Sequence, residues 1–325
     1  MPTFPQPTHV RLPQRTNQPE MTLAVYEQGT GPAVVFCHGF PELAYSWRHQ
    51  LPAVAGAGFR AIAPDQRGYG KSTIPARIED YSLRHLTNDL VGLLDALGID
   101  QAIFVGHDWG GVVVWAMPVL HPQRTLGVVG ICTPYMVLPK VEALKAMVDG
   151  DDERHYIAWF QKPGVAESVL DPNVRMVFEK LLRGGISIDE MMQRAFEGGK
   201  LDMNPFRRLV ELEYLGKPIL SPEELEIYVQ AFERSGFRGG LNWYRNIDRN
   251  VDECPGMGTQ PLTLPCLMLT AQWDAALRPE LAESMKGVCS DLETRMIERA
   301  GHWLQQECPE AVNHHLVDWL RRHFA

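Results

Sequence analysis

The sequence predicts an α/β protein with one mostly parallel sheet that is flanked by helices and interrupted by an inserted helical segment. Short apolar runs typical of buried strands alternate with amphipathic stretches of helix length. Between about residues 134 and 246 this strand pattern disappears, and helical stretches separated by Gly and Pro replace it. The strand pattern then returns, so a chain of 325 residues is expected to form one sheet domain with an insertion.

The expected strands are apolar runs of strand length. They are Ala33–Cys37, Arg60–Ala63, Ala102–Val105, Val128–Cys132 and Cys266–Thr270, followed by a strand-like run at Thr294–Ile297. Because helix-length segments separate most of these runs, we expect crossover connections and therefore parallel pairing.

One crossover helix is predicted over Leu83–Leu97, where leucines recur at helical spacing. Ser82 precedes it as a candidate N-cap, and Gly98 follows it as a candidate C-terminal cap. The helix predicted after residue 108 contains Pro118. Because proline removes one backbone hydrogen bond, we expect this helix to kink or end early there.

The inserted segment is predicted to be all helical. Within it, Ser221-Pro222-Glu223-Glu224 has the residues of a capping box with proline at the first helical position. We therefore expect a core domain of residues 1–133 and 247–325 and a helical lid of residues 134–246. A helical insert above the carboxyl edge of a parallel sheet would cover a ligand site at that edge.

Composition and charge exclude several classes of protein. The chain has 31 Lys and Arg against 40 Asp and Glu, a formal net charge of -9, and the basic residues form no stripe, so nucleic-acid binding is not expected. No apolar run is long enough to span a bilayer, and residues 1–21 lack the pattern of a secretory signal. The six cysteines are scattered without a Cys-x-x-Cys pair, which favours a reducing cytoplasmic compartment without disulfides or a bound metal.

The turn after the strand at Ala102–Val105 carries the first chemical signal. Its sequence is Gly106-His107-Asp108-Trp109-Gly110-Gly111, and an apolar helical stretch follows. A strand, a tight turn with a G-x-D-x-G core and a helix form the layout of a nucleophile elbow, with Asp108 where hydrolases usually place serine. Asp108 could instead only cap the following helix, and the motif alone leaves both interpretations open.

Two downstream residues favour the catalytic interpretation. Asp274 stands just after the strand at Cys266–Thr270, and His302 follows the strand-like run at Thr294–Ile297. Nucleophile, acid and histidine then occur in the chain order of an α/β-hydrolase. Taken singly, Asp274 could be a turn aspartate and His302 a surface or core histidine, but their joint occurrence with Asp108 predicts a catalytic triad.

The loop after the first expected strand begins His38-Gly39-Phe40-Pro41-Glu42. In this fold that loop and the residue after the nucleophile each supply a backbone N–H group, so Phe40 and Trp109 are the predicted oxyanion-hole donors. Glu42 is a candidate for positioning the hydrolytic water together with the histidine, with a surface loop carboxylate as the alternative. His107 is expected to pack beside the elbow.

An aspartate nucleophile divides the reaction into two steps. A carboxyl group has an ordinary pKa of about 4 and is already ionised at neutral pH, so Asp108 can attack an sp³ carbon without help from the histidine. The product is an ester of the enzyme. His302, oriented by Asp274, would then activate water to hydrolyse that ester, and the oxyanion hole serves this second step.

The sequence resembles the soluble epoxide hydrolases of the α/β-hydrolase fold, from the first expected strand to the terminal helix. The stretches that carry the resemblance are HGFPELAYSWRHQLPAVAGAGFRAIAPDQRGYGKS (His38–Ser72), VGHDWGG (Val105–Gly111), HYIAWFQKPGVAE (His155–Glu167) and SGFRGGLNWYRN (Ser235–Asn246). The last two lie in the expected lid. The resemblance implies an enzyme that converts epoxides to vicinal diols.

The resemblance also implies that two lid tyrosines donate hydrogen bonds to the epoxide oxygen, and the matching positions are Tyr156 and Tyr244. Chemistry supports this need, because an opening epoxide develops alkoxide character and a phenol with a pKa near 10 can donate to it at neutral pH. Without the family, packing of an amphipathic side chain is the better explanation for either tyrosine.

Two other functions remain open. A haloalkane or haloacid dehalogenase uses the same Asp-His-acid logic, but it needs N–H donors for the departing halide, of which only Trp109 is suggested here. A non-catalytic binding protein could also keep the pocket, although no triad member is missing. The expected partners are a small-molecule epoxide and water, with no cofactor, and the chain is expected to act as a monomer or homodimer.

Overall fold

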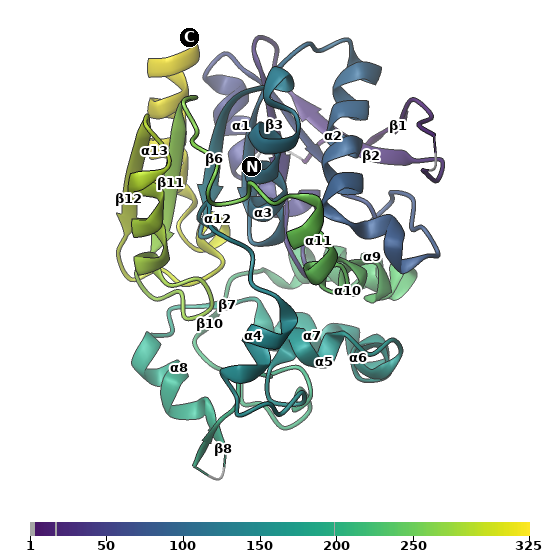
Figure 1. Ribbon diagram of the computed structural model, residues 1–325, viewed down its shortest axis with the longest axis vertical. Coiled ribbons are helices and arrows are strands. Elements are labelled where there is room, and N and C mark those ends of the chain that lie inside the picture. Colours follow the sequence, from purple (N-terminus) through teal and green to yellow (C-terminus); the bar gives the residue numbers. More distant parts are fainter. Residues whose placement is uncertain (1–3, 17, 198) are drawn as a thin grey trace.

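The computed structural model describes residues 4–16, 18–197 and 199–325. Its centre is an eight-stranded sheet with the strand order β1-β2-β4-β3-β5-β6-β11-β12 (Figure 1). The strands are β1 (Thr8–Arg11), β2 (Thr22–Gln28), β3 (Ala33–Cys37), β4 (Arg60–Pro64), β5 (Ala102–His107), β6 (Thr125–Ile131), β11 (Cys266–Ala271) and β12 (Leu292–Ile297).

Six neighbouring strands, from β4 to β12, pair in parallel, and β1 and β2 form an antiparallel edge. The six parallel strands contain the apolar runs expected from the sequence, with boundaries that differ by a few residues. β1 and β2 were not expected. β1 is mostly exposed and polar, and β2 mixes buried apolar residues with Glu27 and Gln28, so neither is a plain apolar run.

The central strands bury both faces. In β3, Val34 and Phe36 belong to one apolar cluster, while Val35 and Cys37 belong to the cluster on the other face, as the two-residue repeat of a strand requires. Helices α1 and α13 pack on the first face, and α2 and α3 on the second. The helices of the core are α1 (Gln50–Gly56), α2 (Leu83–Leu97), α3 (Trp109–Leu120), α11 (Ile247–Glu253), α12 (Leu304–Glu307) and α13 (Pro309–Phe324).

Helix α2 has the predicted bounds but not the predicted N-terminal cap. Ser82 occupies the N-cap position, yet its hydroxyl group donates to Glu253 Oε2 at 2.7 Å, and Asn250 Oδ1 accepts from Leu83 N at 2.7 Å instead. The cap is therefore supplied by the neighbouring helix α11. At the other end, Gly98 has a φ of 67°, the left-handed conformation expected of a C-terminal cap.

The segment between residues 134 and 246 is here called the inserted segment, and its described residues form seven α-helices and, in addition, two short ribbons. The helices are α4 (Val141–Ala146), α5 (Tyr156–Phe160), α6 (Val165–Leu170), α7 (Val174–Leu181), α8 (Ile188–Arg194), α9 (Pro222–Ser235) and α10 (Arg238–Tyr244). The ribbons pair β7 (Arg183–Gly184) with β10 (Lys217–Pro218) and β8 (Phe196–Glu197) with β9 (Lys200–Leu201). These four strands have two residues each, which is too short to leave a periodic pattern in the sequence.

Helix α9 begins with the capping box that its sequence predicted. Ser221 N donates to Glu224 Oε2 at 2.8 Å, and Glu224 N donates to Ser221 Oγ at 3.2 Å. Helix α3 ends at Leu120, shortly after Pro118, in agreement with the expected early end.

The inserted segment packs directly against the core and shares its apolar interior. Figure 1 shows its helices gathered below the sheet, while the C-terminus lies at the opposite end of the molecule. Phe160, Phe237 and Tyr244 of this segment contact Phe40, which follows the carboxyl end of β3. Within the described residues, no helix is both long and apolar enough to cross a membrane.

Candidate active site

Asp108 lies in a strained turn between β5 and α3. Its φ of 51° and ψ of -123° are unusual for a residue with a side chain, and such strain persists only where the surroundings enforce it. Glycines allow this turn to lie close to the loop after β3. A Cβ atom on Gly110 would lie 1.9 Å from Cys37 O, and one on Gly39 would lie 2.4 Å from Asp108 Oδ1. Small residues around Asp108 thus let the elbow meet the loop after β3.

The carboxylate of Asp108 is held by that loop and does not cap α3. Phe40 N donates to Asp108 Oδ1 at 2.7 Å, and Thr133 Oγ1 donates to the Asp108 carbonyl oxygen at 2.8 Å. Asp108 stands at the N-cap position, but among the described residues its side chain accepts no hydrogen bond from α3. Trp109, the other sequence-predicted donor, begins α3, where the first backbone N–H groups of a helix have no partner within it.

His302 lies between two carboxylates. Its Nδ1 is 2.8 Å from Asp274 Oδ2, and its Nε2 is 3.6 Å from Asp108 Oδ2. Asp274 is fully buried, and its Oδ1 accepts from Ala276 N at 2.9 Å and Leu277 N at 2.8 Å. The turn after β11 therefore fixes one carboxylate oxygen and leaves the other for the histidine.

The electrostatics of the three residues are coupled. Burial by itself lowers the pKa of His302, but Asp274 and Asp108 together raise this pKa well above its usual value. Burial opposes ionisation of Asp274, yet its contact with His302 holds the pKa of this carboxyl group below its usual value. The ring is therefore favoured in its charged form while both carboxylates are ionised.

Glu42 is buried below the oxyanion loop rather than exposed at its surface. Its Oε2 accepts from Gly39 N at 2.8 Å and lies 2.7 Å from His107 Nδ1, and its Oε1 accepts from the side-chain amides of Gln305 and Gln306 at 2.8 and 3.1 Å. Although burial opposes ionisation, His107 and Gly39 lower the pKa of Glu42 to about 2. All of these partners fix Glu42 inside the protein.

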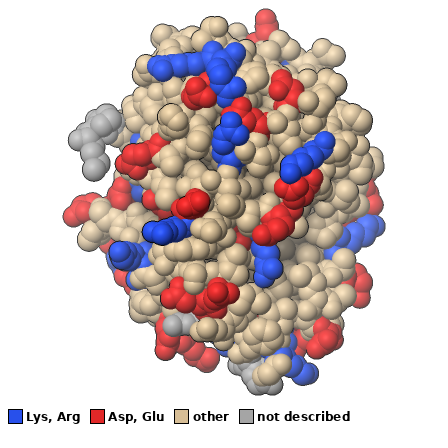
Figure 2. Space-filling model, turned by 90° about the vertical axis from the view of Figure 1, so that its left-hand side faces the viewer, with Lys and Arg blue, Asp and Glu red and all other residues tan. Residues whose placement is uncertain are grey.

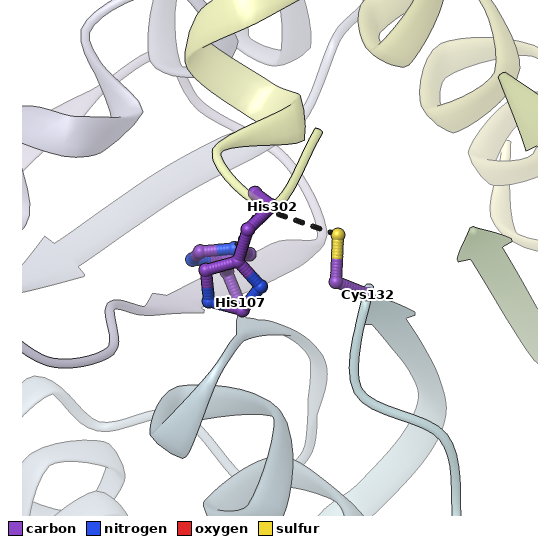
Figure 3. Close-up of side chains that lie close together, drawn as sticks. All are labelled: His107, Cys132 and His302. Carbon is purple, nitrogen blue, oxygen red and sulfur yellow. Dashed lines mark hydrogen bonds between the residues drawn. The ribbon is translucent and has the colours of Figure 1, made fainter. Parts of the chain in front are cut away.

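His107 packs beside the elbow, and with Cys132 it holds the backbone of His302. Its Nε2 donates to the His302 carbonyl oxygen at 2.7 Å. Cys132 Sγ donates to the same oxygen at 3.3 Å (Figure 3). The side chains of these three residues could together bind a metal ion. However, both ring nitrogens of His107 and Nδ1 of His302 already contact Glu42, a carbonyl oxygen and Asp274, so this set would have to rearrange to bind one.

Tyr156 and Tyr244 meet above the elbow although 88 residues separate them in the sequence. Tyr156 is the first residue of α5 and Tyr244 the last of α10, and their ring centroids are 5.8 Å apart. The Tyr244 ring also contacts Trp109 at 5.1 Å and Phe40 at 5.3 Å. Burial first, and then the charge of Asp108, raises the pKa of both phenols above the usual value. Both tyrosines are therefore protonated at neutral pH.

Some residues of the site could not be found from the sequence. Gln305, Gln306 and Glu307 belong to the short helix α12 that follows His302, and each contacts a residue of the oxyanion loop or of the histidine loop. Such contacts depend on the folded geometry, and no sequence motif predicts them.

The chain is similar to known proteins over most of its length. The family described as alpha/beta hydrolase fold matches residues 32–309. Epoxide hydrolase A of Mycobacterium tuberculosis is 40% identical over 92% of this chain and 94% of its own length. The bifunctional epoxide hydrolase 2 of Mus musculus is 43% identical over 94% of this chain, which spans only 54% of that protein.

Solved structures agree with these matches. The crystal structure of epoxide hydrolase A from Mycobacterium thermoresistibile superposes with a TM-score of 0.84, at 40% identity and with 97% of this chain and 98% of that chain covered. An epoxide hydrolase from an endophytic Streptomyces superposes with a TM-score of 0.82 at 33% identity, covering 97% of this chain and 96% of that chain. The chain belongs to the epoxide hydrolases of the α/β-hydrolase fold family.

Proposed function

We propose that this protein hydrolyses epoxides to vicinal diols through a covalent ester on Asp108. One observation carries the proposal. The Asp108 carboxylate is held by Phe40 N on one side, faces His302 on the other, and lies close enough to Tyr156 and Tyr244 for its charge to affect both phenols. An ionised carboxylate and two protonated phenols are the groups that epoxide opening requires.

In the first step, Asp108 Oδ2 attacks one carbon of the epoxide. The bond between this carbon and the epoxide oxygen breaks, and the oxygen takes a proton from Tyr156 or Tyr244. Asp108 Oδ1, which already accepts from Phe40 N, becomes the carbonyl oxygen of the ester. Because the pKa of each tyrosine is raised, the phenols keep their protons until the alkoxide forms.

In the second step, His302 removes a proton from water and the hydroxide attacks the ester carbon. Esterification removes the negative charge of Asp108, one of the two charges that raise the pKa of His302, so the charged ring releases its proton to solvent and becomes able to act as a base. The backbone N–H groups of Phe40 and Trp109 stabilise the oxyanion at Oδ1. When the intermediate collapses, the leaving alkoxide takes the proton from His302, and the proton of the regenerated carboxyl group returns to the tyrosine. The His302 ring then takes up a proton from solvent, because both carboxylates beside it are charged again.

Glu42 contributes to this step by holding the oxyanion loop through Gly39 N. It reaches the histidine loop through His107, whose Nε2 donates to the His302 carbonyl oxygen. Because both carboxylate oxygens are occupied by these partners, we assign any effect of Glu42 on the hydrolytic water to the position of the two loops.

The inserted segment acts as the lid, and the core is formed by residues 1–133 and 247–325. Support comes from α5 and α10, which carry the two tyrosines over the carboxyl edge of the sheet. The substrate is a small molecule that enters between lid and core. Acidic and basic side chains are interspersed on the face in Figure 2, which offers no basic stripe for a nucleic acid. The six free cysteines favour the cytoplasm, and the chain acts as a monomer or homodimer.

The test measures diol formation from styrene oxide by the parent protein and by Tyr156→Phe and Tyr244→Phe. We expect each substitution to slow ester formation by about 100-fold or more, as loss of a general acid typically does, and to leave ester hydrolysis nearly unchanged. Tyr214→Phe is the matched control, because Tyr214 lies in the inserted segment but is exposed. Release of halide from haloalkanes, with no diol from any epoxide, would replace this function by that of a dehalogenase.

A further inference from the structure

The Glu307 carboxylate binds the backbone on both sides of His302. Glu307 is the last residue of α12, five positions after His302. Its Oε2 accepts from Gly301 N at 3.1 Å, and its Oε1 accepts from Trp303 N at 3.1 Å. One carboxylate therefore holds the backbone N–H groups on both sides of His302.

The same carboxylate reaches the inserted segment. Gly185 N donates to Glu307 Oε2 at 3.3 Å, and a Cβ atom on Gly184 would lie only 2.4 Å from this oxygen. Gly184 belongs to β7, which is anchored by its pairing with β10. A glycine at this position lets the ribbon of the inserted segment rest directly on the carboxylate.

A second contact joins the two parts at the same place. Trp303 Nε1 donates to the Leu181 carbonyl oxygen at the end of α7, at 2.7 Å. The residue after His302 is thus attached to the inserted segment by its side chain and to Glu307 by its backbone. Burial raises the pKa of the Glu307 carboxyl group, and the N–H donors of Gly301, Gly185 and Trp303 oppose this rise by favouring the ionised form. Hydrogen bonds to an ionised carboxylate are stronger than those between neutral groups, so they are suited to fix this junction.

We propose that Glu307 is a positioning residue that holds the His302 loop and ties it to the inserted segment, and that it thereby sets the rate of ester hydrolysis. This inference rests on the proposed function, because it assigns His302 to the second step. Glu307 itself contacts neither Asp108 nor the tyrosines in any hydrogen bond of the described residues. Its loss should therefore affect the water attack more than the attack of Asp108.

The test compares the two steps in single turnovers of the full chain with styrene oxide. In Glu307→Ala we expect ester hydrolysis to slow by about 10-fold to 100-fold, since a displacement of about 1 Å at a reacting group can cost that much. Ester formation should change by less than about 3-fold, so the ester accumulates. Glu307→Gln, which keeps one acceptor oxygen, should lie between the parent and Glu307→Ala.

Two further variants separate positioning from folding. Gly184→Ala leaves Glu307 in place but inserts a methyl group against its carboxylate, so it should slow hydrolysis in the same direction. Glu310→Gln changes an exposed carboxylate three residues further along and should behave as the parent does. Hydrogen exchange of backbone amides in residues 183–187 and 299–304 should speed up in Glu307→Ala and Gly184→Ala, and not in β11.

Parent-like rates of both steps in Glu307→Ala and Gly184→Ala would overturn the proposal, as would an equal slowing of both steps. If the parent itself forms neither ester nor diol, the proposed function fails, and the exchange data alone then decide whether Glu307 joins the two segments. Unchanged exchange in both segments would show that it does not.

Discussion

At the scale of single residues, the charge of Asp108 controls His302. The two residues face each other at 3.6 Å, and Asp108 is one of the groups that raise the pKa of the histidine. The charged ring stabilises the nucleophile before the reaction. Loss of the Asp108 charge on ester formation lets the ring release its proton to solvent and act as a base. The same pair therefore serves both steps without moving.

This coupling can be measured by NMR titration of the His302 ring. Asp108→Asn replaces the carboxylate by a neutral amide that resembles the ester in charge. Because one of the raising charges is then absent, we expect the pKa of His302 to be lower in this variant than in the parent. The ring then becomes neutral at a lower pH. An unchanged or higher pKa in Asp108→Asn would contradict the coupling, and the distant exposed His9 serves as the reference.

Residue types and spacing predicted the three residues of the proposed triad, but not the residues that support them or the environment of the site. Asp108, Asp274 and His302 follow strand ends in the order that the fold requires, so the sequence alone could place them together. Glu42 looked like a loop residue that could equally be exposed, and the structure buries it completely. Its burial depends on Gln305 and Gln306, which lie more than 260 positions away and cannot be inferred from local pattern.

At the scale of elements, the elbow depends on close contact between backbones. Helix α3 begins where the loop after β3 passes, and Gly110 leaves no room for a side chain against the Cys37 and His38 carbonyl groups. Because these neighbours are backbone atoms of a buried strand and its loop, they cannot yield as a flexible side chain would.

Gly110→Ala should therefore destabilise the protein by about 1–3 kcal/mol or more in urea unfolding, with loss of activity. Gly56→Ala is the matched control. Gly56 is also a helical glycine, but a Cβ atom there would meet nothing within 4 Å, so this variant should be as stable as the parent or more stable. Equal stability of the two variants would mean that the elbow relaxes at no cost.

Elements with a plain apolar pattern were predictable, and those that depend on context were not. The inner parallel strands agree with the expected runs, because burial on both faces leaves an uninterrupted apolar stretch. Helix α2 agrees because its apolar residues recur at helical spacing. The edge strands β1 and β2 and the ribbons of the inserted segment were missed, since their residues are partly exposed or too few. The N-terminal cap of α2 could not be predicted either, because it comes from Asn250 in another helix.

At the scale of the whole molecule, a buried ion pair connects the sheet, α2 and the inserted segment. Arg67, in the loop after β4, donates to both oxygens of Asp89 at 2.6 and 2.7 Å and to the Asp80 carbonyl oxygen at 2.7 Å. The Arg67 carbonyl oxygen accepts from Trp243 Nε1 of α10 at 3.1 Å. The loop that supports α10, and with it Tyr244, is thus fixed by this pair.

Asp89→Ala should lower the free energy of unfolding by about 3–5 kcal/mol, because it leaves the buried Arg67 guanidinium without its counter-charge. Asp95→Ala removes a carboxylate of the same helix whose ion pairs with Arg15 and Arg124 are partly exposed, and it should cost about 1 kcal/mol or less. Urea unfolding of both variants gives the comparison. A similar small decrease in the free energy of unfolding in both variants would show that the ion pair between Arg67 and Asp89 does not stabilise the fold.

Intact-protein mass spectrometry can detect the covalent ester that we propose Asp108 carries and His302 hydrolyses. The His302→Gln variant is mixed with styrene oxide and quenched after a short reaction. We expect a protein heavier by one substrate molecule, with the added mass on the peptide that contains Asp108, and no such adduct in Asp108→Asn. An adduct that persists in Asp108→Asn, or diol formation by His302→Gln at the parent's rate, would contradict this mechanism.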